Sequence, residues 1–447
     1  MTVFVAIVAV VAVLALLALV HRWLWVRLVR DTTRAGGPVR RAGTVLAFAL
    51  PLLALAALTA GRAGAPFWLQ QLVSWPGYMW LAVLLYLTLA MVVAEPVRRL
   101  WLRRLPAPRA PREPEELEEL EAAAPAAPGP APQGPDGLEF AVPAGGGAGA
   151  EPRLREGAGG GAGPQGPAPQ DGGVSRRVFV ARTLGGAAVA AAGLTVGTGT
   201  YGVLRGPRVK RVQVPLARLP RAAHGFRIAV VSDVHLGPVL GRAHTRRIVD
   251  TVNRTQPDLI AIVGDLVDGD VHDLGPAAEP LRELRARLGS YFVTGNHEYF
   301  SGAQQWVDHV RELGLTPLEN ARRELPHFDL AGVNDIQGES EGHGPDFQAA
   351  LGDRDRSRAS VLLAHQPIVI DDAVRHGVDL QLSGHTHGGQ LWPGKYLAEL
   401  ANPTVAGLER YGDTQLYVSR GAGAWGPPVR VGAPSDITVV ELASYQA

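Results

Sequence analysis

The 447-residue chain contains no cysteine. Disulfide bonds, thiolate metal ligands and cysteine nucleophiles are therefore all excluded, while the redox state of the compartment stays open. The chain also has almost no net charge, +1 at pH 7, so its overall balance gives no sign of a nucleic-acid partner. Its length is greater than one domain usually needs, so we expect a division into several parts.

Charge is missing altogether from three long stretches near the N-terminus. Residues 2–20, 43–60 and 67–94 are strongly apolar and contain no Asp, Glu, Lys or Arg. Each comes close to the roughly 20 apolar residues that a membrane-spanning helix needs. We therefore predict a transmembrane region over residues 1–105 with three helices at about these positions. The alternative, buried helices of a large soluble protein, accounts less well for the arginines around them.

Arginine is distributed unevenly around these stretches. The connection 61–66 holds only Arg62, whereas the other flanks are rich in arginine. The arginines between the first two stretches and after the third are Arg22, Arg27, Arg30, Arg34, Arg40, Arg41, Arg98, Arg99, Arg103 and Arg104. Because cytoplasmic loops carry the excess of positive charge, we expect these flanks inside the cell and the N-terminus outside.

Two further segments precede the C-terminal half. Residues 106–172 are Pro, Ala, Gly and Glu with few aromatics, which predicts a disordered cytoplasmic linker. Residues 173–205 contain the pair Arg176-Arg177 and then a weakly apolar run, which resembles a twin-arginine export signal. A fourth membrane helix is the alternative. Both interpretations predict a multi-pass protein of the cell membrane with residues 206–447 on the extracytoplasmic side.

Residues 206–447 alternate short apolar runs with helical stretches, as in α/β domains with a largely parallel sheet. Five apolar runs end in residues that can bind metal. These run ends are Ser232-Asp233-Val234-His235, Gly264-Asp265-Leu266-Val267-Asp268, Gly295-Asn296-His297-Glu298, His365-Gln366-Pro367 and Gly384-His385-Thr386-His387. A single such residue would be an ordinary turn former. Ligands of these sheets collect at the carboxyl ends of the strands, so five such ends predict one shared site.

The donors of these five motifs are too many for one metal ion. They are Asp233, His235, Asp265, Asn296, His365, His385 and His387. Nitrogen and oxygen donors suit manganese, iron, zinc or nickel without choosing among them. We therefore predict two divalent or trivalent metal ions as cofactors. Two ions about 3.5–4 Å apart, with an acidified water bridging them, are suited to in-line attack at phosphorus.

Over about residues 225–390 the motifs occur in the order Asp-x-His, Gly-Asp-x-x-Asp, Gly-Asn-His-Glu, a lone His and Gly-His-x-His. This order resembles that of the calcineurin-like metallophosphoesterase superfamily. The resemblance implies an α/β (α+β) sandwich of two mixed β-sheets flanked by helices. It implies one ion held by Asp233, His235, Asp265 and His387, and a second held by Asp265, Asn296, His365 and His385, with Asp265 bridging. It further implies that His297 is the catalytic acid or transition-state donor and that Asp268 orients it.

Two details narrow the resemblance. Protein phosphatases of this superfamily follow the second aspartate with Arg-Gly, whereas here Asp268 is followed by Gly269-Asp270. The stretch Gly388–Pro393 (GGQLWP) instead looks like a bacterial, membrane-associated branch, some members of which carry twin-arginine signals or act on lipid phosphoesters. This branch is therefore our expectation for the chain.

These features together predict a membrane-anchored phosphodiesterase in which a metal-bridging hydroxide attacks the phosphoester. The expected partners are the membrane and a phosphoester substrate, whether lipid, cell-wall or nucleotide derived, and no nucleic acid. One alternative is a nuclease of the same superfamily, which would need a basic stripe for phosphates. Another is a metal-binding module without turnover, which the complete set of motifs disfavours. The sequence leaves the oligomeric state open.

Overall fold

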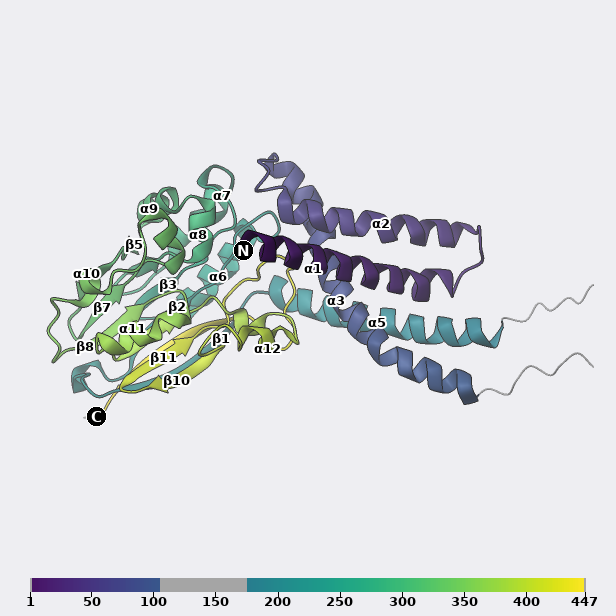
Figure 1. The fold of residues 1–447 in the computed structure, drawn as a ribbon. Coiled ribbons are helices and arrows are strands. Elements are labelled where there is room, and N and C mark those ends of the chain that lie inside the picture. Colours follow the sequence, from purple (N-terminus) through teal and green to yellow (C-terminus); the bar gives the residue numbers. More distant parts are fainter. Residues whose placement is uncertain (1, 105–174, 446–447) are drawn as a thin grey trace, which may run out of the picture.

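The computed structural model describes residues 2–104 and 175–445 (Figure 1). The expected linker, 106–172, lies outside the described residues. A helical bundle occupies one end of the molecule and an α/β domain the other (Figure 1). The chain crosses between them at Gly206, directly after the last bundle helix.

Long apolar helices build the bundle. They are α1 (Thr2–Trp25), continued by η1 (Val26–Arg30), α2 (Pro38–Thr59), α3 (Phe67–Arg104) and α5 (Arg176–Leu204). Within the described residues, four helical stretches are long and apolar enough to cross a membrane. Helix α3 runs past the uncharged stretch to Arg104, and the largely buried carboxylate of Glu95 accepts hydrogen bonds there from Arg27, Arg98 and Arg99 at 2.8–3.2 Å. These contacts join the ends of α1 and α3.

Small residues let the bundle helices approach one another closely. A Cβ atom at Gly77 of α3 would lie 2.6 Å from the Cβ of Ala57 and 2.9 Å from the carbonyl carbon of Leu53, both on α2. Such small-residue contacts are the usual means of packing helices in a membrane, where lipid competes for every apolar surface. The α2–α3 crossing therefore depends on the absence of a side chain at Gly77.

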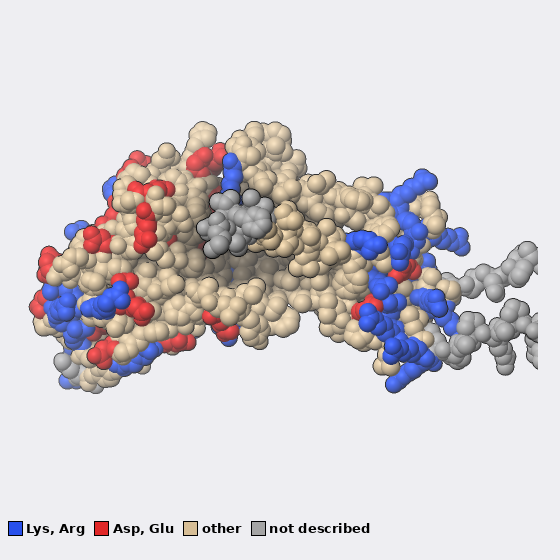
Figure 2. Space-filling view, in the orientation of Figure 1, with Lys and Arg blue, Asp and Glu red and all other residues tan. Residues whose placement is uncertain are grey.

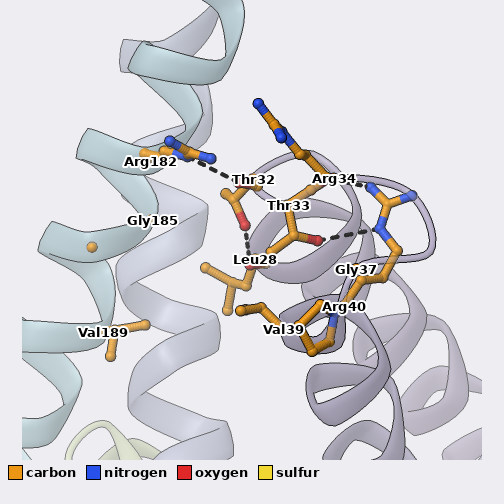
Figure 3. Close-up of a pocket in the computed structure, with 12 residues that line it drawn as sticks. Leu28, Thr32, Thr33, Arg34, Gly37, Val39, Arg40, Arg182, Gly185 and Val189 are labelled. Atoms are coloured by element: carbon orange, nitrogen blue, oxygen red, sulfur yellow. Dashed lines mark hydrogen bonds between the residues drawn. The ribbon is translucent and has the colours of Figure 1, made fainter. Parts of the chain in front are cut away.

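Helix α5 packs as a member of this bundle. Its residues Ala188, Ala192 and Val196 are buried in one apolar cluster with Leu87 and Met91 of α3. At the arginine-rich end, Arg182 donates a hydrogen bond of 2.9 Å to the carbonyl oxygen of Thr32. Figure 3 shows this contact beside a cavity of about 640 Å³ between α5 and the α1–α2 connection.

Two six-stranded sheets form the α/β domain. The first has the order β1 (Arg208–Leu216), β12 (Asp436–Ser444), β2 (Phe226–Val231), β3 (Leu259–Val263), β4 (Ser290–Val293) and β5 (Thr316–Pro317). The second has the order β10 (Gly407–Tyr411), β11 (Thr414–Val418), β9 (Leu380–Ser383), β8 (Ala359–Leu363), β7 (Phe328–Gly332) and β6 (Ala321–Glu324). Strands β2–β3–β4–β5 and β7–β8–β9–β11 are parallel, while β12, β6 and β10 each make an antiparallel pair.

The predicted sandwich of two mixed sheets is therefore confirmed, and its core lies between the sheets. Aliphatic residues of both inner faces fill this core, and the rings of Phe226 and Phe328 meet edge to face at 5.1 Å across it. Helices cover the two outer faces. Helices α6 (Arg242–Arg254), α7 (Val271–Ala278) and α9 (Ala303–Glu312) pack on the first sheet, and α10 (Phe347–Leu351) and α11 (Ile370–Arg375) on the second.

The carboxyl ends of the central parallel strands meet at one edge. The loops after β2 and β3 pair there, since the amide of Asp233 donates to the carbonyl oxygen of Gly264 at 3.1 Å. The loops after β8 and β9 pair likewise, with the amide of Gly384 donating to the carbonyl oxygen of His365 at 2.9 Å. Segments far apart in the sequence are thereby held in a fixed register where the polar motifs begin.

The close approach at Gly77 generates a stability prediction. We expect Gly77→Ala to lower the free energy of unfolding of the full chain in detergent by about 1–3 kcal/mol, since overpacking forces α2 and α3 apart. Gly193→Ala on α5 is the matched control, because a Cβ there meets no atom within 4 Å. The control should be neutral or slightly stabilising, since alanine favours helix. Thermal unfolding followed by circular dichroism measures both, and equal melting temperatures for the two variants would contradict the prediction.

Candidate metal centre

Left-handed backbone conformations turn the motif side chains toward a common point. Asp233, His235, Asp265, His385 and His387 have φ values between 48° and 73°. This region is uncommon for residues with a Cβ, and it persists only where the surrounding structure enforces it. Such strained residues concentrate at functional sites. These residues lie in the turns that follow three different strands, β2, β3 and β9. The backbone strain is therefore a shared feature of the site and is not confined to one loop.

The first group of donors consists of Asp233, His235 and His387. Their ligand atoms lie within 4.8 Å of one another, and all three side chains are buried. The Nε2 atoms of His235 and His387 are 2.9 Å apart, and Nε2 of His387 is 3.4 Å from Oδ1 of Asp233. Two imidazole nitrogens and a carboxylate oxygen thus converge on one small volume, as the ligands of one cation do.

The second group consists of Asp265, His365 and His385. Nδ1 of His365 lies 2.9 Å from the carbonyl oxygen of Val263 and donates to it, which leaves the lone pair on Nε2. That buried Nε2 is 3.1 Å from Oδ2 of Asp265, yet it has no well-aligned hydrogen-bond partner among the described residues. Oδ1 of Asn296 lies 3.0 Å from Nδ1 of His385 and brings the amide into the same group.

Asp265 lies between the two groups. Its Oδ2 is 3.7 Å from Nε2 of His235 in the first group and 3.1 Å from Nε2 of His365 in the second. Burial alone would raise the pKa of Asp265, but the nearby His365, followed by His235, holds it well below its usual value. The side chain is therefore a carboxylate, placed where one residue can serve both groups.

The donor set fits two metal ions. Nε2 of His365 makes no hydrogen bond with the described residues, and imidazole nitrogens and carboxylate oxygens face one another within each group, as the ligands of a cation do. The seven predicted ligand residues are all brought to this edge by the fold. Asp233, His235 and His387 form one group, Asp265, His365 and His385 the other, and Asn296 adjoins the second. Nitrogen and carboxylate oxygen donors do not select one transition metal.

His297 and Asp268 lie beside the first group. Nδ1 of His297 is 2.6 Å from Oδ1 of Asp268, the partner that we predicted for it. Burial lowers the pKa of His297, but the hydrogen bond and charge of Asp268 outweigh burial and raise it to about 9. The same Oδ1 also lies 3.1 Å from Nδ1 of His235, a contact that the sequence did not suggest. Asp268 therefore orients a donor residue as well as His297.

The sequence indicated no role for Glu298, whose carboxyl group fixes the backbone of the loops that carry Asp265 and Asn296. Its side chain is fully buried, and its carboxylate accepts hydrogen bonds from the amides of Asp265, Leu266 and Gly295 at 2.9, 2.7 and 2.6 Å. Burial raises the pKa of Glu298 to about 7, with the charge of Asp265 acting in the same direction. The sequence signal that could have identified Glu298 was its position in the Gly-Asn-His-Glu motif, in the first turn of α8 (Asn296–Ser301).

Arg430 is a second residue that the sequence did not indicate. Its guanidinium is buried and donates to the carbonyl oxygens of Gly423 and His387, at 2.7 Å each. It also lies 3.0 Å from Nδ1 of His387. Burial lowers the pKa of Arg430 to about 10, so it remains a cation at neutral pH. Arg430 stands in an irregular loop with no motif around it, and only the tertiary structure brings it to the site.

Comparison with known proteins agrees with this geometry. The family model for calcineurin-like phosphoesterase matches residues 226–389, which contain every predicted ligand. A metallophosphoesterase of Bacillus subtilis is 31% identical over 61% of this chain and 98% of its own length. One of Aquifex aeolicus is 34% identical over 53% of this chain and 91% of its own length. The chain thus has the fold and the site of a metal-dependent phosphoesterase, and it belongs to the calcineurin-like metallophosphoesterase family.

Other relatives come from animals. A "transmembrane protein with metallophosphoesterase domain" of Danio rerio is 39% identical over 56% of this chain and 61% of its own length. The chain thus matches about three-fifths of that relative. Among solved structures, a dimetal phosphatase of Danio rerio is similar over 49% of this chain and 93% of its own, at 13% identity and a TM-score of 0.33. Since relatives include animal and bacterial proteins, the comparisons do not single out a bacterial branch.

The contacts of Glu298 generate a prediction about metal retention. We expect Glu298→Gln to lower the free energy of unfolding by about 2 kcal/mol, because an amide has only one oxygen to accept the three buried hydrogen bonds that the carboxyl group accepts. The amide NH₂ would also face backbone N–H groups, so the loops that carry Asp265 and Asn296 should loosen. Metal analysis after gel filtration should then show reduced metal content.

The matched control for this variant is Glu283→Gln, at an exposed position outside the site. The control should keep the metal content and melting temperature of the unaltered protein. Full metal content and an unchanged melting temperature in Glu298→Gln would show that its carboxylate does not organise the site.

Proposed function

We propose that this chain is a membrane-anchored, binuclear metal-dependent phosphodiesterase. The observation that carries the proposal is the position of Asp265 between two buried donor groups, with His297 lining the adjacent cavity. One ion would be held by Asp233, His235, Asp265 and His387, and the other by Asp265, Asn296, His365 and His385. When bound, the ions would neutralise phosphate oxygens and lower the pKa of a coordinated water.

The residues of the chain itself supply orientation and a proton. Asp268 holds Nδ1 of His297, so Nε2 is the ring nitrogen available to donate to the substrate. In hydrolysis an oxygen of water bonds to phosphorus while the P–O bond to the leaving alcohol breaks. His297 donates its Nε2 proton to the leaving oxygen, and a proton released by the attacking water restores it. The products are a phosphomonoester and an alcohol.

Two carboxylates at the rim of the cavity favour diesters over monoesters. A phosphomonoester carries close to two negative charges at neutral pH, because its second pKa is about 6. The described lining includes Asp270 and Asp273 besides Asp268, whose charge is paired with His297, and the one Lys or Arg of this lining is Arg62. Metal ions and His297 would attract both classes of ester, so the selection rests on Asp270 and Asp273, which repel a dianion more strongly than the single charge of a diester. The same lining offers no basic stripe for a nucleic acid, so the nuclease alternative receives no support from it.

The first test of the proposed reaction uses the full chain, purified in detergent and loaded with manganese. We expect faster hydrolysis of bis(4-nitrophenyl) phosphate than of 4-nitrophenyl phosphate, read as release of 4-nitrophenolate. Asp265→Asn should reduce kcat at least 100-fold, because it removes the carboxylate that both groups share. Asp250→Asn, on the exposed face of α6, is the matched control and should keep full activity.

Other results would lead to different conclusions. Preference for the monoester would contradict the diesterase assignment and keep the metal mechanism. Faster cleavage of DNA than of either small ester, with a steep loss in salt, would favour a nuclease. An absence of turnover in folded, metal-loaded protein would favour a binding role.

Membrane anchoring is supported by the distribution of charge over the bundle. Figure 2 shows Lys and Arg gathered at the end of the bundle far from the α/β domain, with an uncharged belt between. By the positive-inside rule that end would be cytoplasmic and the α/β domain extracytoplasmic. The burial of Ala188 and Ala192 against α3 supports α5 as a retained fourth span rather than a cleaved export signal. Export of the α/β domain by the twin-arginine pathway stays a prediction.

The absence of cysteine makes this orientation directly testable. Ala35 and Ala63 are exposed and lie in the two connections at opposite ends of α2. We expect Ala63→Cys to react with a membrane-impermeant maleimide in intact cells. Ala35→Cys should react only after lysis, so each variant is the control for the other. Labelling of Ala35→Cys alone in intact cells would reverse the proposed orientation.

A further inference from the structure

We infer that the substrate is a membrane-resident amphiphile, a phosphodiester whose apolar chain lies against α2 and α3 while its phosphate reaches the metal centre. This inference rests on the proposed function and specifies its substrate class. It is carried by the shape and lining of the cavity at the site, and independently by apolar side chains on the surface of the α/β domain.

One wall of the cavity at the site comes from the α/β domain and the other from the helical bundle. It measures about 390 Å³, and His235, Asp268 and His297 line it on the side of the α/β domain. Its opposite wall comes from the bundle, where Leu58 and Leu81 are among the lining residues. This wall also contains the polar residues Gln70, Ser74 and Tyr78, so it offers an apolar chain and a polar headgroup surface side by side.

The bundle wall lies at the end of the spans nearest the α/β domain. Ala57 and Leu58 belong to the last turn of α2, and Phe67 is the first residue of α3. A molecule that leaves the metal centre along these helices therefore moves toward the apolar belt of the bundle. Lipid chains occupy that level in a bilayer, so the cavity connects a hydrolytic site with the depth at which a lipid headgroup lies.

Polar and aromatic groups of the cavity suit a phosphate joined to an apolar chain. Arg62, in the α2–α3 connection, is exposed and lines the cavity. It is thus available to an anionic ester. The rings of Phe300 and Trp425 lie 5.5 and 5.7 Å from that of His297 and are about half exposed. They present apolar surface beside the proton donor.

A separate patch supports contact between this face of the α/β domain and a membrane. Helix α12 (Gly394–Ala398) and its flanks expose Trp392, Tyr396, Leu397 and Leu400, the last at 84%. Figure 1 shows α12 at the end of the domain that faces the bundle. The neighbouring Leu391 packs against the apolar cluster of the bundle itself. Exposed Trp, Tyr and Leu beside membrane helices are expected to lie in the lipid headgroup region.

The test compares two diesters with the same reacting bond. Methyl 4-nitrophenyl phosphate is soluble in water, whereas hexadecyl 4-nitrophenyl phosphate inserts into lipid nanodiscs that contain the full, metal-loaded chain. Both release 4-nitrophenolate, so their kcat/KM values are directly comparable. We expect kcat/KM to be at least 10-fold higher for the hexadecyl ester, because its chain lies against α2 and α3.

Two variants test whether the preference for the hexadecyl ester arises from the cavity. Leu58→Ser should lower the ratio of hexadecyl to methyl kcat/KM at least fivefold. Leu55→Ser is the matched control, since Leu55 is exposed on the same helix but does not line the cavity, and it should keep the original ratio. Melting temperatures and metal content establish that both variants are folded.

The outcomes separate this inference from the function on which it rests. Equal kcat/KM for the two esters, or an equal change of the ratio in both variants, would overturn the amphiphile and leave the diesterase intact. Turnover of neither ester by metal-loaded protein would overturn the diesterase and the inference with it.

Discussion

The buried carboxylate of Asp265 is the constraint on which the site depends. An ionised side chain away from water is costly unless cations and hydrogen bonds compensate it. Here His365, His235 and the amide of His297 surround the side chain, and Glu298 accepts hydrogen bonds from the backbone amides of Asp265 and Leu266. The site thus holds a carboxylate away from water, which favours the binding of cations by the donors around it.

Helix α5 of the bundle contacts the loop that carries Arg430, next to the predicted metal site. The carbonyl oxygen of Gly199, near the end of α5, accepts a hydrogen bond of 3.4 Å from the amide of Arg430. A Cβ at Gly199 would lie 2.7 Å from Val429, so the helix and this loop are in close contact. The side chain of Arg430 in turn holds the carbonyl oxygen of His387. The bundle therefore supports a loop that positions a predicted metal ligand.

The same contact helps to explain why the bundle lies against the α/β domain. Leu391 and Val431 pack on bundle residues on one side, and Val203 packs with Leu240 and Ala424 on the other. The edge that carries the predicted ligands thus faces the bundle, whose helices close part of the cavity. Under the proposed function, the bundle would contribute to the choice of substrate together with the two donor groups.

The sequence by itself determined an α/β domain and the convergence of the seven ligand residues at one sheet edge, because short apolar runs that end in Asp, Asn or His are local signals. Through the resemblance to a known family, the sequence also implied the sandwich of two mixed sheets. It also indicated the pairing of Asp268 with His297, through the resemblance. Only the tertiary structure revealed Glu298 as a support for the Asp265 turn, Arg430 behind His387, and the wall that α2 and α3 add to the cavity. Those contacts join segments tens to hundreds of residues apart, and no periodicity or motif records which distant residues will pack together.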